Sequence, residues 1–312
     1  MDTVIQHIIS DLSPVYSQDE ARELAYWILE ESVGITRTQL LMGCKVTKKI
    51  PNYKVILQRI LKKEPIQYIF GHTEWFGLDL RVTPATLIPR PETAELVTYI
   101  SHHLPQCLLR AFPEGRPKVA RRQTEGEPTL DRHSTDTQPT LIRQSKPLSR
   151  VRVLDIGTGS GCIAIALKKQ HPEWSVSAMD ISQEALTVAQ ENAQRNHVQI
   201  DFLHGDIFTD EIKDFDIIVS NPPYVLESEK SAMDNNVLDY EPHTALFVPD
   251  NDPLRYYRRI ASLKKAPYLF FEINQQKGAS LCSLLQELGY TDIHLQKDTY
   301  GNDRILSARI NN

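Results

Sequence analysis

Apolar residues recur along this chain with two different periods, and the change between them divides it into parts. Within the first 65 residues the spacing is helical, and the clearest helix follows Ser17-Gln18-Asp19-Glu20, a sequence typical of a capping box. Its apolar positions are Ala21, Leu24, Ala25, Ile28 and Leu29. This part carries no catalytic spacing, so we expect residues 1–65 to form a helical, substrate-docking domain.

A different pattern runs from residue 66 to residue 105. Leu78-Asp79-Leu80-Arg81-Val82 alternates between apolar and polar residues, which predicts a half-buried strand or hairpin arm. Leu87-Ile88-Pro89-Arg90-Pro91-Glu92-Thr93 follows, and its prolines stiffen the backbone on both sides of an arginine. We expect residues 66–105 to be a hairpin and a linker to a catalytic domain, with the charges of Arg90 and Glu92 aimed into a cleft.

Apolar periodicity is lost between residues 106 and 150, where Pro, Thr, Gln, Arg and Glu dominate. This segment holds nine basic and five acidic residues, a net charge of +4. Connections of this length without apolar periodicity are usually disordered. We therefore expect residues 106–150 to be a disordered insertion.

Strand and helix patterns alternate over residues 151–312. Short apolar runs typical of buried strands cover 151–156, 175–179, 199–204, 215–219 and 268–273. Helical patterns lie between them at 163–168, 182–196 and 254–265, then at 276–288, and two last strands lie near Ile293 and Ile305. This alternation predicts an α/β domain, a Rossmann-like parallel sheet with helices on both faces.

The first of these strands leads into a glycine-rich turn, and an acid, Asp155, precedes the turn. Such turns let backbone approach a nucleotide closely, and Asp180, which ends the next strand, can accept both ribose hydroxyls. A dinucleotide enzyme would also fit this pair, but the glycine spacing is G-x-G-x-G and not G-x-G-x-x-G. An acid before the turn favours a cationic cofactor such as S-adenosylmethionine, because a pyrophosphate prefers a bare helix N-terminus. The residues of the turn are Gly157, Thr158, Gly159, Ser160 and Gly161.

Two later strand ends also carry polar residues. Asp206 ends the third strand and can hold the adenine amino group, with Ile207 and Phe208 beside the ring. The fourth strand stops at Ser220 before Asn221-Pro222-Pro223-Tyr224, a stiff turn because proline has no N–H and restricts the residue before it. Free carbonyls, an amide side chain and an aromatic ring there can bind a planar group with two N–H donors. Such a group is a carboxamide or the exocyclic amine of a base.

Composition and charge narrow the class of protein further. A length of 312 residues favours two domains, and a net charge of -5 argues against a protein held mainly by nucleic-acid phosphates. The four cysteines lie far apart, without zinc-ligand spacing, so we expect reduced thiols and no metal. No run approaches the ~18 apolar residues of a membrane helix, and the N-terminus lacks the regions of a signal peptide. These features predict a cytoplasmic protein without a membrane partner.

Taken together, these motifs resemble the class I S-adenosylmethionine methyltransferases that modify planar nitrogen. More narrowly, the chain resembles the release factor glutamine methyltransferases, the PrmC/HemK family, over nearly its whole length except residues 106–150. The shared motifs are P-I-Q-Y at 65–68, F-G at 76–77, I-P-R-P-E-T at 88–93, N-P-P-Y at 221–224, Y-E-P at 240–242 and the ending at 298–304. N-P-P-Y alone is shared with adenine and guanine methyltransferases, whereas I-P-R-P-E-T is far more specific.

The resemblance implies methylation of the glutamine side-chain amide in the Gly-Gly-Gln motif of peptide-chain release factors. It further implies that Asn221, Pro222 and Tyr224 are catalytic and that Asn221 also contacts the cofactor. These three residues, together with Pro223, Arg90 and Glu92, would form the substrate site. An amide nitrogen is a poor nucleophile because its lone pair is delocalised into the carbonyl. The Asn221 side-chain oxygen and the Pro222 carbonyl would accept its two N–H groups, and the cofactor would supply the electrophile. A general base is not needed before transfer, because the product sheds a proton readily.

Two other interpretations stay open. A methyltransferase of adenine or guanine in nucleic acid would use the same pocket with the base stacked on Tyr224. It would want a basic channel, whereas the chain outside residues 106–150 carries a net charge of -9. A non-catalytic module that kept the cofactor fold is disfavoured because every chemical position is intact. We expect peptide-chain release factors as partners, no stably bound nucleic acid, and a monomer.

Overall fold

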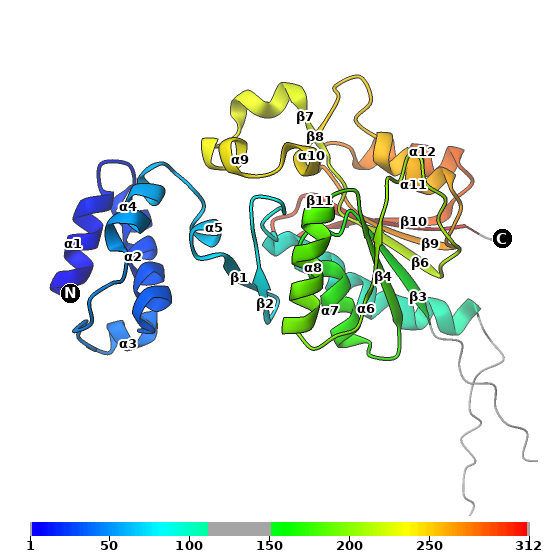
Figure 1. Ribbon diagram of the computed structural model, residues 1–312. Coiled ribbons are helices and arrows are strands. Elements are labelled where there is room, and N and C mark those ends of the chain that lie inside the picture. Colours follow the sequence, from blue (N-terminus) through cyan, green and yellow to red (C-terminus); the bar gives the residue numbers. More distant parts are fainter. Residues whose placement is uncertain (1, 112–150, 311–312) are drawn as a thin grey trace, which may run out of the picture.

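The computed structural model describes residues 2–111 and 151–310, which form a helical N-terminal part followed by a helix-covered sheet (Figure 1). The helices of the N-terminal part are α1 (Thr3–Leu12), α2 (Gln18–Val33), α3 (Arg37–Leu41), α4 (Tyr53–Leu61) and α5 (Ile66–Phe70). The capping box of α2 is confirmed, because Ser17 Oγ accepts the Glu20 N–H at 3.3 Å and Glu20 Oε2 accepts the Ser17 N–H at 3.0 Å.

One apolar cluster holds these helices together. Ile8 and Leu12 of α1 are buried against Ile28 and Leu29 of α2, and Ile66 at the start of α5 belongs to the same cluster. The packing of the helical part therefore reaches a few residues past position 65. The assignment of residues 1–65 to a separate docking domain remains a prediction.

A hairpin and a long helix connect this part to the sheet. The predicted hairpin is present as β1 (His72–Trp75) and β2 (Leu78–Arg81), which pair antiparallel. Helix α6 (Pro91–Ala111) follows and continues into the range 106–150, where we expected disorder. The expected disorder of residues 106–150 stays a prediction, because the helix as described ends inside that range, at Ala111. The remainder of that range, 112–150, lies outside the described residues.

Seven strands form the main sheet in the order β10-β11-β9-β6-β3-β4-β5. Their bounds are β3 (Arg152–Ile156), β4 (Ser175–Asp180), β5 (Asp201–His204), β6 (Ile217–Ser220), β9 (Tyr268–Glu272), β10 (Thr291–Lys297) and β11 (Asp303–Arg309). The strands β3, β4, β5, β6 and β9 are parallel to each other, as predicted. The sheet is nevertheless mixed, because β11 runs antiparallel to β9 and β10 antiparallel to β11. A short connection between β10 and β11 cannot cross over the sheet, so it returns as a hairpin.

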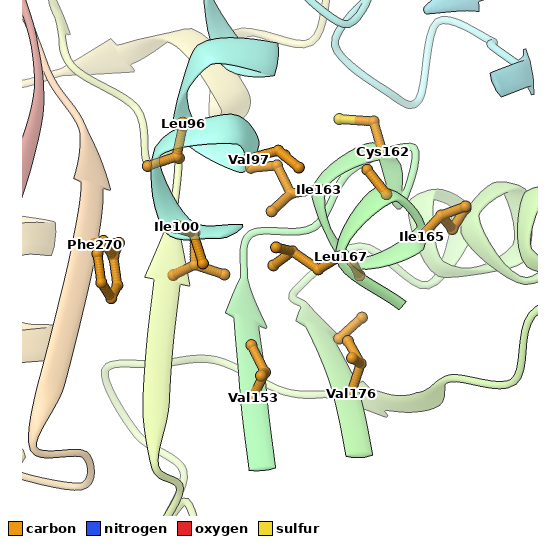
Figure 2. Close-up of a cluster of buried hydrophobic side chains, with 14 of the residues drawn as sticks. Leu96, Val97, Ile100, Val153, Cys162, Ile163, Ile165, Leu167, Val176 and Phe270 are labelled. Atoms are coloured by element: carbon orange, nitrogen blue, oxygen red, sulfur yellow. The ribbon is translucent and has the colours of Figure 1, made fainter. Parts of the chain in front are cut away.

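Helices cover both faces of this sheet, which confirms the Rossmann-like architecture. On one face lie α6, α7 (Cys162–Gln170) and α8 (Gln183–Arg195), and on the other α11 (Arg255–Ser262) and α12 (Gly278–Glu287). Figure 2 shows the first face, where Leu96 and Ile100 of α6 and Leu167 of α7 pack over Val153 of β3. Successive strand residues point to opposite faces, so Leu154 belongs to the second cluster.

Five short elements between β6 and α11 were not predicted. They are β7 (Val225–Leu226), the 3₁₀ helix η2 (Glu227–Ala232), α9 (Asn235–Tyr240), α10 (His243–Leu246) and β8 (Phe247–Val248). This excursion follows directly on the Asn221 turn (Figure 1). Among the described residues, no helix combines the length and the apolar character needed to cross a membrane.

Candidate active site

The carboxyl ends of β5, β4, β3 and β6 lie next to each other at one edge of the sheet, because these strands are parallel neighbours. A cavity of about 320 Å³ opens at this edge. Ligand sites in open α/β sheets form at such an edge, and small-molecule sites are usually roughly 300–1,000 Å³. The sequence-predicted residues that line it are Arg90, Gly157, Thr158, Gly159, Ser160, Asp180, Asp206, Ile207, Phe208, Asn221, Pro222 and Pro223.

The glycine turn after β3 is anchored to the neighbouring strand by its own backbone. The N–H groups of Gly157 and Thr158 both donate to the carbonyl oxygen of Met179, at 2.9 and 3.0 Å. Gly159 has a φ of +54° with open space around it, so glycine is needed there for backbone conformation. Gly161 does not line the cavity: a Cβ there would lie 3.1 Å from Ala189 Cβ, so glycine lets α7 pack closely on α8.

Asp180 lies at the end of β4 and faces the cavity. Its Oδ2 accepts the Gly159 N–H at 2.8 Å, and its Oδ1 accepts the Ser182 N–H at 2.9 Å. Burial raises the pKa of this carboxyl, and these two backbone hydrogen bonds oppose the rise. The Ile181 N–H acts on the same carboxylate, and of its roughly four lone-pair sites at least one stays open to a further donor such as a ribose hydroxyl.

Asp155 is fully buried beneath the glycine turn and does not line the cavity. Thr158 Oγ1, which belongs to a cavity-lining residue, donates to Asp155 Oδ2 at 2.6 Å. From the residues that the structure describes, no hydrogen bond of good geometry reaches Asp155 Oδ1, although the Ala164 amide favours the charged form. Burial raises the pKa of this carboxyl to about 7. Asp155 can therefore act on a bound cation through Thr158 and through its field, without direct contact.

The wall expected to hold adenine is formed after β5. Asp206 Oδ1 accepts the Phe208 N–H at 2.9 Å, which closes a tight turn and places Asp206, Ile207 and Phe208 in the lining. Two residues of α11 that the sequence did not single out complete this wall. The Arg255 guanidinium lies 4.6 Å from the Phe208 ring centre, and Tyr256 meets the same ring edge-on at 5.2 Å.

Asn221 and Pro222 line the cavity directly after β6. Asn221 Nδ2 donates to Thr93 Oγ1 at 3.3 Å, and Thr93 Oγ1 donates to Glu272 Oε2 at 2.7 Å. Tyr224 is placed outside the lining, with its hydroxyl donating to Glu272 Oε1 at 3.2 Å. Thr93 and Glu272 are both buried.

Of the two charges that were expected in a cleft, Arg90 lies in the loop before α6 and Glu92 in the first turn of α6. Arg90 lines the cavity, but its Nη2 donates to Glu241 Oε1 at 2.6 Å, and Glu241 is only 4% exposed. Trp75 Nε1 donates to the Arg90 carbonyl at 2.8 Å and holds the loop from the other side. Glu92 is not part of the lining. The roles of Arg90 and Glu92 in substrate binding remain predictions.

Sequence reasoning missed Thr93, Glu241 and Glu272 as site residues. A usable signal existed for Glu272, which is an acid at the end of an apolar strand, as are Asp180 and Asp206. Thr93 stands in the I-P-R-P-E-T motif, which supports the family resemblance but does not by itself indicate a site residue. Its hydroxyl contact with Glu272 joins residues 179 positions apart, and no local pattern indicates such a contact.

The residues of the cavity fit S-adenosylmethionine. Asp180 offers oxygens to a ribose, and Asp206 and an apolar wall can bind adenine. The acids Asp155, which is buried, and Asp180, which lines the cavity, favour a bound cation. Within the described ranges, no cluster of three or more His, Cys, Asp or Glu side chains has metal-binding geometry.

Fold and site together define a class I S-adenosylmethionine-dependent methyltransferase. The Methyltransferase small domain family matches residues 134–239, and the PrmC N-terminal domain family matches residues 3–71. The chain is 39% identical to a release factor glutamine methyltransferase of Bacteroides thetaiotaomicron, covering 99% of both chains. It is 37% identical to that of Flavobacterium psychrophilum, covering 96% of this chain and 95% of the relative. The chain belongs to the release factor glutamine methyltransferase family, as its motifs indicated.

Among solved structures, the chain is similar to the hMettl16 catalytic domain in complex with the MAT2A 3'UTR hairpin 6. The TM-score is 0.51 and the sequence identity 15%, over 76% of this chain and 77% of the other. This likeness concerns the fold alone.

Proposed function

We propose that this protein transfers a methyl group from S-adenosylmethionine to the side-chain amide nitrogen of the glutamine in the Gly-Gly-Gln motif of peptide-chain release factors. Membership of the family supports the reaction and the substrate. The observation that carries the chemistry is the placement of Asn221 and Pro222 in the wall of the cofactor cavity, with Asn221 Nδ2 bound by Thr93.

The proposed role of Asn221 follows from this hydrogen bond. Because Nδ2 donates to Thr93, Oδ1 of the same amide is free to accept a hydrogen bond from a ligand. The Pro222 carbonyl is a second acceptor, and no hydrogen bond to it is found within the described part of the chain. A substrate carboxamide has two N–H donors, which these two acceptors can bind together.

Binding both N–H groups fixes the orientation of the substrate nitrogen. An amide lone pair lies perpendicular to the amide plane, so acceptors in that plane leave it directed at the reacting carbon. When bound, the cofactor supplies an electrophilic methyl group on its sulfonium. The protein contributes orientation and exclusion of water, which lower the barrier by pre-arranging the reactants. Tyr224 would hold the turn through Glu272.

We further propose that the helical part grips the release factor outside the Gly-Gly-Gln loop. The hydrogen bond of 3.0 Å from Tyr240 Oη to the Lys62 carbonyl supports this, because it links α4 to the excursion that follows the Asn221 turn. In this account the protein is a cytoplasmic monomer that forms no stable complex with nucleic acid.

Methyl transfer to purified substrates tests the proposed function. Folded release factor and the same mass of RNA and DNA are each incubated with labelled cofactor and the protein. The proposal expects label in the release factor alone. Label in nucleic acid, with none in the release factor, would contradict the proposal and favour the base methyltransferase.

A further inference from the structure

A buried carboxylate lies directly behind the Asn221 turn. Parallel pairing of β6 with β9 sets Ser220 opposite Phe271, so the next residues, Asn221 after β6 and Glu272 at the end of β9, lie side by side at this edge of the sheet. Glu272 is 1% exposed, and its two oxygens accept hydrogen bonds from Thr93 Oγ1 and from the Tyr224 hydroxyl. Thr93 in turn accepts a hydrogen bond from Asn221 Nδ2.

The direction of these hydrogen bonds is determined by chemistry. When Glu272 is ionised it only accepts, so Thr93 donates its single hydroxyl hydrogen to Glu272. Toward Asn221, the Thr93 oxygen can then only accept. Of the two ends of the Asn221 carboxamide, only the amino end can satisfy it, and the carbonyl end is turned away from Thr93.

We propose that Thr93 and Glu272 are positioning residues that hold the Asn221 carboxamide with its oxygen toward the substrate. This inference rests on the proposed function and adds the reason why the Asn221 carboxamide does not flip to exchange its oxygen and its amino group. A flipped Asn221 amide would present its N–H donors to an N–H group of the substrate glutamine. The two facing N–H groups would then both lack an acceptor. The chain of hydrogen bonds from Asn221 through Thr93 to Glu272, here called the relay, therefore distinguishes a productive site from one of the same shape that cannot bind the nucleophile.

Three of the groups around Glu272 favour its charged, accepting form. The groups that act on it are the donors Thr93 and Tyr224, the Arg304 guanidinium and the Glu92 carboxylate. Burial raises the pKa of Glu272, and this is the largest effect, while the two donors and Arg304 oppose it. Arg304 is itself held by Asp298 Oδ2 at 3.2 Å. The last motif of the chain, residues 298–304, is thereby connected to the Asn221 turn.

A matched pair of variants tests the inference. Thr93→Val keeps the shape of the side chain and removes its hydroxyl, and Thr93→Ser keeps the hydroxyl. With Val, the half-buried Asn221 amino group loses its acceptor, and we expect kcat/KM for release factor to fall about 10- to 100-fold. Affinity for S-adenosylmethionine, measured by calorimetry, should change less than about twofold, because Thr93 acts through Asn221. Thr93→Ser should keep at least a third of the parental rate.

A second measurement separates this role from a merely structural one. In an Asn221→Ala background the relay has nothing to orient, so adding Thr93→Val should lower the residual rate no further. A further tenfold loss there, or parental activity of Thr93→Val alone, would overturn the inference. Thermal unfolding is followed throughout. If Thr93→Val loses its fold, Thr93→Ala, which lacks the hydroxyl without inserting a methyl group, takes its place with the same expected results. Failure of the parent protein to methylate release factor would contradict the proposed function instead.

Discussion

The backbone N–H of Gly159 donates a hydrogen bond of 2.8 Å to Asp180 Oδ2, so the glycine turn and the end of the neighbouring strand form one unit. The other oxygen of Asp180 accepts the N–H of Ser182, whose side chain caps α8. Three elements thus fix this carboxylate before a ligand arrives. A carboxylate held in advance loses little conformational freedom on binding, which favours affinity.

Replacing Asp180 by Ala should therefore weaken cofactor binding. Loss of a charged acceptor to the ribose hydroxyls costs roughly 1.5–3 kcal/mol, so we expect the dissociation constant to rise about 10- to 100-fold. Asp180→Asn is the matched control, because it keeps the side-chain volume and one acceptor oxygen. Its dissociation constant should lie between those of the parent and of Asp180→Ala. Unchanged affinity of Asp180→Ala in calorimetry would mean that the ribose lies elsewhere.

Asn221→Ala should lower turnover to a small residual rate and leave cofactor affinity within a few fold. Asn221 positions the nucleophile in this account, and losing such a contact costs ~10²-fold or more in rate. The control is Asn251→Ala, which changes an exposed residue. Release factor methylation by Asn221→Ala at more than a tenth of the parental rate would remove Asn221 from its role.

Much of this fold was predictable because local patterns specify it. The glycine turn, the apolar strands and the proline turn at 222–223 are short-range signals, and each lies where the sequence placed it. The antiparallel hairpin β10–β11 could not be told from parallel strands, because an apolar run carries no direction. The contacts of Glu272 and Glu241 depend on strand order and on loop packing, which single-residue patterns do not contain.

Asp155 should make the stability of the cofactor-free protein depend on pH. Its pKa is about 7 in the folded protein, against 3.8 for a free side chain. Between these values the folded state holds a proton that the unfolded chain has released, so this residue lowers stability as the pH rises from about 4 to about 7. The loss is up to about 4 kcal/mol, and Asp155→Asn should lack it. Denaturant unfolding of both proteins across this range checks the prediction, and parallel curves would contradict it.

The ion pair between Arg90 and Glu241 leads to a prediction about stability. Arg90→Met leaves the buried Glu241 carboxylate without its cation, which should cost about 2 kcal/mol, less than for a fully buried pair because Arg90 is partly exposed. The double variant Arg90→Met/Glu241→Gln should recover at least half of that loss. Trp75, whose Nε1 contacts the same loop, provides a fluorescence signal for unfolding. A double variant less stable than Arg90→Met would contradict this account of the loop.

Recognition of the release factor should need more than the glutamine. Folded release factor should outcompete a short Gly-Gly-Gln peptide. Deletion of residues 1–65 should lower methylation far more than cofactor binding. The cofactor-binding measurement also reports whether the truncated protein is folded. Binding should weaken only moderately with salt. A nucleic-acid enzyme would lose ~0.7–0.9 in log K per phosphate contact for each tenfold rise in salt. Equal use of peptide and protein would contradict a second grip by the helical part.

The central claim is that the acceptor atom is a glutamine side-chain nitrogen. Peptide mapping by mass spectrometry, after release factor has been incubated with S-adenosylmethionine and this protein, tests it most directly. The account predicts a mass increase of one methylene on the glutamine of the Gly-Gly-Gln motif. This increase disappears when that glutamine is replaced by alanine, and its rate of formation falls ~10²-fold or more when the enzyme carries Asn221→Ala. A methyl group on any other residue, or one that persists in the Gly-Gly-Ala release factor, would contradict it.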